Sequence, residues 1–230
     1  MSPDEWAIVS LSLKVSIVAV LATLPFAFML AWLLARRRFP GKVLLDALVH
    51  LPLVLPPVVI GWLLLLALGP AGPIGARLQS WLGITVMFRW TGAAIAAGIM
   101  ALPLMVRAIR LSIETVDHRI EDAARTLGAS PAYSFATITL PLSLPGIITS
   151  VILGFARSIG EFGATITFVS NIPDETRTLP IAIYSALQIP GSEAAVWRLA
   201  MISILLSLGA LVISEAISQR VRAGRSGHVL

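Results

Sequence analysis

The sequence contains no cysteine, and its three histidines, His50, His118 and His228, lie far apart. Without cysteine the chain can form no disulfide, no thiolate metal site and no cysteine nucleophile, and the scattered histidines make no ligand cluster. A glycine-rich loop ending in Gly-Lys-Ser/Thr is also absent, so the chain has no phosphate-binding loop of its own. We therefore expect no catalytic residues, no metal site and no cofactor in this chain.

Charged residues are scarce as well. They make up 13% of the 230 residues, whereas 57% are apolar, and the mean hydropathy is +0.90. Such a chain has too few polar residues to cover a water-soluble globule. The net charge of +5 does not indicate a nucleic-acid partner, because the basic residues lie beside apolar blocks and are not interleaved with aromatics. The composition predicts an all-α integral membrane protein in contact with the lipid bilayer.

Five apolar blocks are long enough to cross a hydrocarbon core of ~30 Å, which takes roughly 20 helical residues. The predicted spans are approximately 7–35, 43–68, 91–110, 139–162 and 196–218. Pro52, Pro56 and Pro57 are too many for an uninterrupted second helix. That block is either a kinked packing helix or a broken segment that lines or gates a pathway.

The basic residues are unevenly distributed along these blocks. They cluster at one set of block ends, as in 36–38 and at Arg220, Arg222 and Arg225. By the positive-inside rule, the N-terminus is expected outside the membrane and the C-terminus in the cytoplasm. No internal repeat is visible, so a two-fold pathway would require a homodimer. The chain is expected to form a single transmembrane domain over residues 1–230.

One charged segment, residues 114–136, separates the apolar blocks on either side of it. It begins with an amphipathic helix. Its apolar or small residues form one stripe, and its charged residues occupy the other side, which is expected to face water or a partner. The stripe consists of Ile120, Ala123, Ala124 and Leu127, and the charged side of Arg119, Glu121, Asp122 and Arg125.

A sharp corner is predicted after this helix. Gly128 can take the left-handed conformation that ends a helix, and Ser130 followed by Pro131 supplies an N-cap and a first-turn proline for the next helix. Pro141 lacks a backbone N–H, so it is expected to bend or restart that second helix where it enters the apolar block. The pattern predicts a short helix fixed rigidly to a membrane span.

The run 122–124, followed at fixed spacing by Gly128, Ile138 and 140–141, resembles the EAA signature of permease subunits of binding-protein-dependent ABC importers. The glutamate position of that signature holds Asp122, and Glu121 comes directly before it, so either acid can fill the role. Residues 50–65 and 157–180 are similar to molybdate-transport permeases in particular, and the likeness covers nearly the whole chain.

The resemblance implies the type I permease fold of ABC importers, with about five transmembrane helices and a cytoplasmic coupling helix, in the bacterial inner membrane. It implies a translocation subunit for a tetrahedral oxyanion, namely molybdate, with tungstate able to pass. Sulfate-type permeases are the nearest alternative, and an autonomous secondary transporter is a further one. The coupling residues would be Glu121, Asp122, Ala123, Ala124, Arg125, Gly128, Ile138, Leu140 and Pro141.

The same resemblance implies three protein partners. A cytoplasmic ABC ATPase would bind ATP and Mg²⁺, an extracytoplasmic oxyanion-binding protein would deliver the substrate, and a second copy of the chain would complete the pathway.

Arg157 and Glu161 stand four residues apart, so they are expected on one face of a continuing helix. Charges at membrane depth are expensive and usually face protein or water. The two residues are therefore either a structural pair or neighbours of an anion route, which should offer several weak donors rather than one tight cation. The candidate route residues are Pro56, Pro57, Arg157, Ser158, Glu161, Thr165 and Thr167.

Overall fold

The computed structural model of the protein describes residues 2–226, and the side chains of Arg220, Arg222 and Arg225 lie outside what it describes. This part of the chain is helical throughout and contains no strand. Its helices are α1 (Pro3–Arg36), α2 (Lys42–Val54), α3 (Pro57–Leu68), α4 (Gly75–Leu82), α5 (Trp90–Glu114), α6 (His118–Thr126), α7 (Pro131–Ser134), the π-helical turn η1 (Phe135–Thr139), α8 (Leu140–Ile159), α9 (Gly163–Val169), α10 (Leu179–Leu187) and α11 (Glu193–Ser226).

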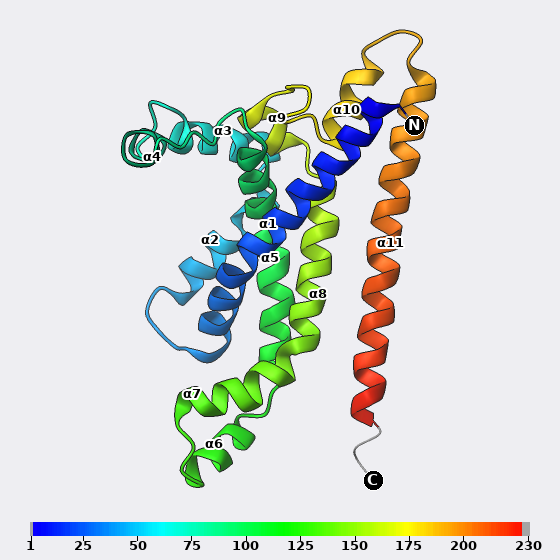
Figure 1. Ribbon diagram of the computed structural model, residues 1–230. Coiled ribbons are helices and arrows are strands. Elements are labelled where there is room, and N and C mark those ends of the chain that lie inside the picture. The colour runs from blue at the N-terminus through cyan, green and yellow to red at the C-terminus, as the bar shows by residue number, and fades with distance from the viewer. Residues whose placement is uncertain (1, 227–230) are drawn as a thin grey trace.

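Helix α5 lies at the centre of the bundle, packed between α1 and α8 (Figure 1). Small residues allow this close packing. A Cβ atom added at Gly98 would lie 2.5 Å from Thr23 Oγ1 of α1, and one added at Gly154 would lie 2.7 Å from Met105 Sδ. Small side chains at such crossings let helix backbones approach in lipid, where the hydrophobic effect does not drive helices together.

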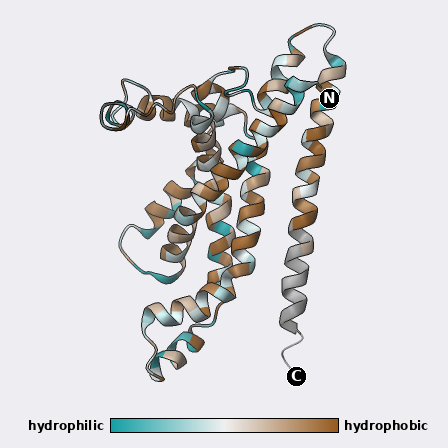
Figure 2. Ribbon diagram, in the orientation of Figure 1, coloured by the Kyte–Doolittle hydropathy of each residue, from teal (hydrophilic) through white to brown (hydrophobic). Residues whose placement is uncertain are grey.

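Four helical segments are long and apolar enough to cross a membrane: Pro3–Arg36, Trp90–Glu114, Pro131–Ile159 and Glu193–Ile213. They overlap the expected spans 7–35, 91–110, 139–162 and 196–218. Large apolar side chains such as Leu21, Leu205 and Val212 are exposed on α1 and α11. Figure 2 shows apolar residues along these helices, as expected for faces that contact lipid.

The expected span over residues 43–68 is not one continuous helix. Helices α2 and α3 meet at an angle of 114°. Leu55 and Pro56, which connect them, are extended, with ψ of 143° and 132°. Each precedes a proline, and a residue in that position is driven out of the helical region by the proline ring. Pro52, by contrast, lies inside α2 without ending it.

The sequence predicts a bend or restart of the helix at Pro141, but the helical run from Pro131 to Ile159 continues through this proline. The turn before the proline is widened instead: the Leu140 N–H bonds to the Phe135 carbonyl, five residues earlier. Single π turns of this kind fit an extra residue into a helix without breaking it. The segment after the corner is therefore joined to the membrane span by uninterrupted helix.

The two ends of the bundle differ. Helices α6 and α7 project from one end, whereas α4, α10 and the N-terminus lie at the other (Figure 1). At that second end Arg198 of α11 pairs with Glu5 of α1, with 2.9 Å between Nη2 and Oε1. This ion pair connects the two long helices that are most separated in the sequence.

Candidate coupling segment and translocation residues

Helix α6 is bounded by local capping interactions. The Asp117 carboxylate accepts a hydrogen bond from the Arg119 N–H at 2.9 Å and caps its start. At its end, the Ala129 N–H bonds to the Ala124 carbonyl at 3.0 Å, and Gly128 has a φ of +90°. This is a Schellman motif, which favours glycine because other residues are strained at positive φ.

The second helix starts as the sequence predicts. The Ser130 hydroxyl accepts a hydrogen bond from the Tyr133 N–H at 3.2 Å, and Pro131 occupies the first turn. Ser130 is the N-cap and satisfies one of the free N–H groups of that turn. The predicted corner between two helices is therefore present.

The apolar stripe of α6 does not pack against the rest of the chain. Ile120, Ala123 and Leu127 are all exposed, and Leu127 retains 89% of its surface. Ala124 is half-buried. Exposed apolar groups gathered on a short helix mark a surface that another protein can cover. Most of the apolar stripe of α6 is therefore open to a partner.

Glu121 holds α6 to the rest of the protein. Its side chain is 13% exposed, and Oε1 lies 2.9 Å from Nη2 of Arg36, whose side chain is 7% exposed. The hydroxyl of Thr139, which is buried in η1, donates to the same carboxylate oxygen. Asp122 is 70% exposed and lies 3.9 Å from Arg125. Of the two adjacent acids, Glu121 therefore makes the structural contact.

Aromatic contacts bind η1, which leads into α8, to α1. The ring of Phe135 lies edge-on to Phe28 and Trp32, with centroid distances of 5.9 Å and 6.2 Å, and the Arg37 guanidinium lies 5.3 Å from the Trp32 ring. Edge-on aromatic pairs and cation–π contacts are both favourable. Together with the pair between Arg36 and Glu121, they join α1, α6 and η1 into one unit.

The remaining signature residues lie on the helix that leads away from the corner. Ile138 and Leu140 are half-buried, and Pro141 is exposed. They extend the unit into α8.

Two of the route candidates lie where α3 contacts α9. A Cβ atom added at Gly163 would lie 2.7 Å from Pro57 Cβ, and one added at Gly61 would lie 2.7 Å from Thr167 Cβ. Pro56 is exposed beside this contact. Pro57 and Thr167, which are far apart in the sequence, therefore both lie at the contact between α3 and α9.

Arg157 and Glu161 form an ion pair with 2.7 Å between Nη1 and Oε2, but they do not share a continuous helix. Helix α8 ends at Ile159, so that expectation is wrong. Glu161 is in the break, is 2% exposed, and accepts a hydrogen bond from the Ala164 N–H of α9 at 2.9 Å. A carboxylate at a helix N-terminus is favourable, because free N–H groups and the helix dipole both stabilise negative charge.

The hydroxyls proposed as anion donors are mostly engaged. Thr165 donates to the Phe162 carbonyl and Thr167 to the Gly163 carbonyl, each at 2.8 Å. Ser158 Oγ is buried and has no hydrogen-bond partner within the described residues. The structure therefore leaves Ser158 as the uncommitted hydroxyl of the three.

Sequence reasoning missed Arg36 and Thr139 as partners of Glu121. Arg36 belongs to the basic run at 36–38, which indicated only the direction of the chain across the membrane. Its partner lies 85 residues away, and no local pattern connects the two.

Comparison with known proteins identifies similar sequences over nearly the entire chain. The family model described as "Binding-protein-dependent transport system inner membrane component" matches residues 7–223. The chain is 60% identical over 227 residues to the molybdenum transport system permease protein ModB of Escherichia coli (strain K12), covering 98% of this chain and 99% of that protein.

More distant proteins share the fold. The sulfate transport system permease protein CysT of Salmonella typhimurium is 35% identical over 229 residues, covering 99% of this chain and 81% of that protein. A chain of a crystal structure of a bacterial alginate ABC transporter, in complex with an alginate-bound periplasmic protein, has a TM-score of 0.75 at 15% identity. That likeness covers 96% of this chain and 80% of the other.

Proposed function

The chain belongs to the family of binding-protein-dependent transport system inner membrane components, and we propose that it is the permease subunit of an ATP-driven molybdate importer. The full-length similarity to a molybdenum permease carries the choice of substrate. Sulfate is not favoured, because the similarity to a sulfate permease is much lower. Tungstate is a similar tetrahedral dianion and should follow the same route. The subunit is a transport protein and not a catalytic enzyme.

The energy for transport must come from a partner protein, and the exposed surface of α6 is suited to bind that partner. We propose that a separate ATPase, which binds ATP and Mg²⁺, covers the exposed side chains of Ile120, Ala123 and Leu127. Burying an exposed leucine-sized side chain contributes about 1.5–3 kcal/mol. The exposed charges of Asp122 and Arg125 flank this patch and can fix the orientation of the partner.

The orientation follows from the basic residues near α6. Arg36 contacts α6 directly, and Arg110 pairs with Asp46 of α2 at 3.0 Å near the same end of the bundle. We propose that this end is cytoplasmic, by the positive-inside rule, and that an oxyanion-binding protein docks at the opposite end, beside α4 and α10. A second copy of the chain would complete the pathway.

Movement of α6 can reach the membrane spans through the unit formed with α1 and η1. The carboxylate of Glu121 contacts Arg36 at the end of α1 and Thr139 just before α8. A displacement of α6 by the ATPase would therefore move the inner ends of two spans together. Packed interfaces of this kind switch between discrete arrangements rather than deforming continuously.

The test is the substrate dependence of ATP hydrolysis. The permease is purified with its ATPase, and hydrolysis is measured with the binding protein loaded with molybdate, tungstate or sulfate. We expect stimulation by molybdate and tungstate and little by sulfate. Stimulation by sulfate alone, or failure of any ATPase to co-purify, would contradict the proposal.

A further inference from the structure

One face of α5 stays open although α5 is the most buried of the four long helical segments. Two cavities, of about 520 Å³ and 680 Å³, lie on either side of this face, and Arg107 and Leu111 line both. The first cavity is closed on its other side by α2, and the second by α8. We refer to the two together as the α5 groove.

Arg107 is a basic residue of this groove that forms no ion pair within the described residues. Its neighbour Arg110 bonds to Asp46 at 3.0 Å and to Glu114 at 2.8 Å, and Asp46 also lies 3.2 Å from His50. Within the described residues Arg107 has no ion pair, and its side chain is exposed. The groove therefore offers one free guanidinium beside a neutralised cluster.

Hydroxyl groups line the other half of the groove. Ser112, Thr115 and Thr149 all face the larger cavity. Like Thr165 and Thr167, all three donate to a backbone carbonyl: Ser112 to that of Ser143 at 3.3 Å, Thr115 to that of Ser112 at 2.7 Å, and Thr149 to that of Pro145 at 2.8 Å. A hydroxyl can rotate away from such a local bond to donate to an anion. These groups are weak donors without net charge, which suits an ion that must also leave.

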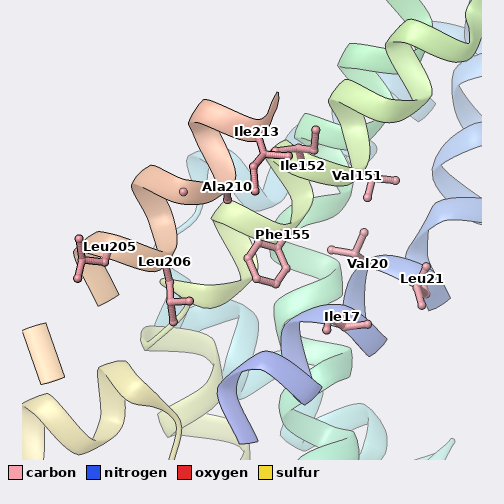
Figure 3. A pocket seen from close by; sticks show the side chains of 11 residues that line it. Ile17, Val20, Leu21, Val151, Ile152, Phe155, Leu205, Leu206, Ala210 and Ile213 are labelled. Atoms are coloured by element: carbon pink, nitrogen blue, oxygen red, sulfur yellow. The ribbon is translucent and has the colours of Figure 1, made fainter. Parts of the chain in front are cut away.

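The groove is not built to face lipid. Arg107 stands seven residues before the end of α5, which is about 10 Å along the helix axis. Arg107 also lies within the expected span 91–110, and charged groups inside a span usually face water or protein, because exposure to hydrocarbon is costly. The cleft between α1, α8 and α11, of about 410 Å³, is the opposite case. Figure 3 shows that aliphatic side chains and Phe155 line it, and no charged residue is among them.

Arg157, the cation among the candidate route residues, is less suitable as an anion contact. Its guanidinium is held 2.7 Å from the buried carboxylate of Glu161, which cancels its charge locally.

We propose that Arg107 contacts the transported oxyanion in the inner half of the membrane, so that the anion route runs along the α5 groove. The inference rests on the proposed function and assigns a residue to it. A planar guanidinium presents paired N–H donors that match two oxygens of an oxyanion. A single exposed cation raises the local anion concentration without trapping the ion.

The experiment uses the permease, its ATPase and its binding protein assembled in liposomes, with molybdate uptake as the measurement. The variants are Arg107→Gln, Arg107→Lys and, as a matched control, Arg38→Gln, which removes an exposed arginine near the same end. Each variant is assayed in phosphatidylcholine liposomes and in liposomes containing phosphatidylglycerol. The amount of assembled complex is measured for each.

We expect Arg107→Gln to lower uptake about tenfold in both lipid mixtures, at unchanged amounts of complex. Arg107→Lys should recover part of the loss, because it keeps the charge but not the planar donors. Arg38→Gln should transport like the wild type.

Equal uptake by Arg107→Gln and Arg38→Gln would overturn the inference while leaving the proposed function intact. A loss seen only with phosphatidylglycerol would also overturn it, because Arg107 would then bind a lipid headgroup. A wild-type complex that takes up no molybdate would overturn the proposed function itself.

Discussion

Replacing Glu121 and Asp122 separately tests how α6 is held, because the two carboxylates are adjacent in the sequence but differ in their surroundings. Glu121 is 13% exposed and contacts Arg36 and Thr139, whereas Asp122 is 70% exposed. We predict that Glu121→Ala releases α6 from the rest of the protein. Asp122→Ala should leave α6 in place.

The two substitutions should differ more than tenfold in their effect on the population of docked α6. Removing one partner of a buried ion pair costs about 3–5 kcal/mol, because the other charge is left without compensation. Arg36 is 7% exposed, so the lower bound of about 3 kcal/mol is appropriate at the edge of the bundle. Since each 1.4 kcal/mol is tenfold, the docked position of α6 should lose about 100-fold in population. Loss of the exposed pair of Asp122 and Arg125 costs about 0–1 kcal/mol.

Hydrogen exchange of the α6 amides measures this population directly, because exchange reports the free energy of local opening. The permease without its ATPase is compared in lipid nanodiscs. We expect exchange about 100-fold faster in Glu121→Ala than in the wild type, and no resolved change in Asp122→Ala. The double variant Arg36→Met with Glu121→Ala should recover protection, since it removes both charges of the pair together. Equal exchange in the two single alanine variants would refute the assigned role of Glu121.

Three further substitutions test the corner, the docking surface and the buried pair. Gly128→Val should impair coupling of transport to ATP hydrolysis, because a left-handed conformation costs a β-branched residue about 1–2 kcal/mol; near-normal molybdate uptake would argue against this corner. Ala124→Glu should lower the amount of ATPase that co-purifies more than Arg119→Ala does, and equal losses would count against docking on this surface. Glu161→Ala should reduce the amount of folded permease on size-exclusion chromatography, since it leaves the Arg157 charge unpaired and uncaps α9. Arg157→Gln should reduce this amount less, and the reverse order would contradict a structural role for Glu161.

Features set by neighbouring residues could be predicted from the sequence. Gly128, Ser130 and Pro131 specify a corner through their own backbone preferences, and the structure shows it. Pro52, Pro56 and Pro57 indicated that the second block is either kinked or broken, and the structure shows it broken. The angle of 114° between its halves could not be predicted, because it depends on how α3 packs against α9.

Features that depend on distant residues could not be predicted. The choice between Glu121 and Asp122 is decided by Arg36 and Thr139, which local spacing does not connect to α6. Periodicity correctly divides α6 into an apolar and a charged side, but it does not say which side is covered. Ile120 and Leu127 remain exposed because no other part of the described residues 2–226 covers them.

The end of α8 shows a further limit. The spacing of Arg157 and Glu161 suited a continuing helix, and the ion pair does form. However, the helix stops at Ile159, and the carboxylate caps the next helix instead. A pair of residues four apart can meet across a helix end as well as along a helix, so spacing alone did not distinguish the two.

Molybdate uptake into liposomes, with and without ATP on the ATPase side, tests the energy source and the transported ion together. For the permease assembled with its ATPase and binding protein, we predict uptake that requires ATP and persists when sulfate is present in excess. We predict no uptake by the permease alone under a molybdate gradient. ATP-independent uptake by the permease alone would contradict an ATP-driven importer.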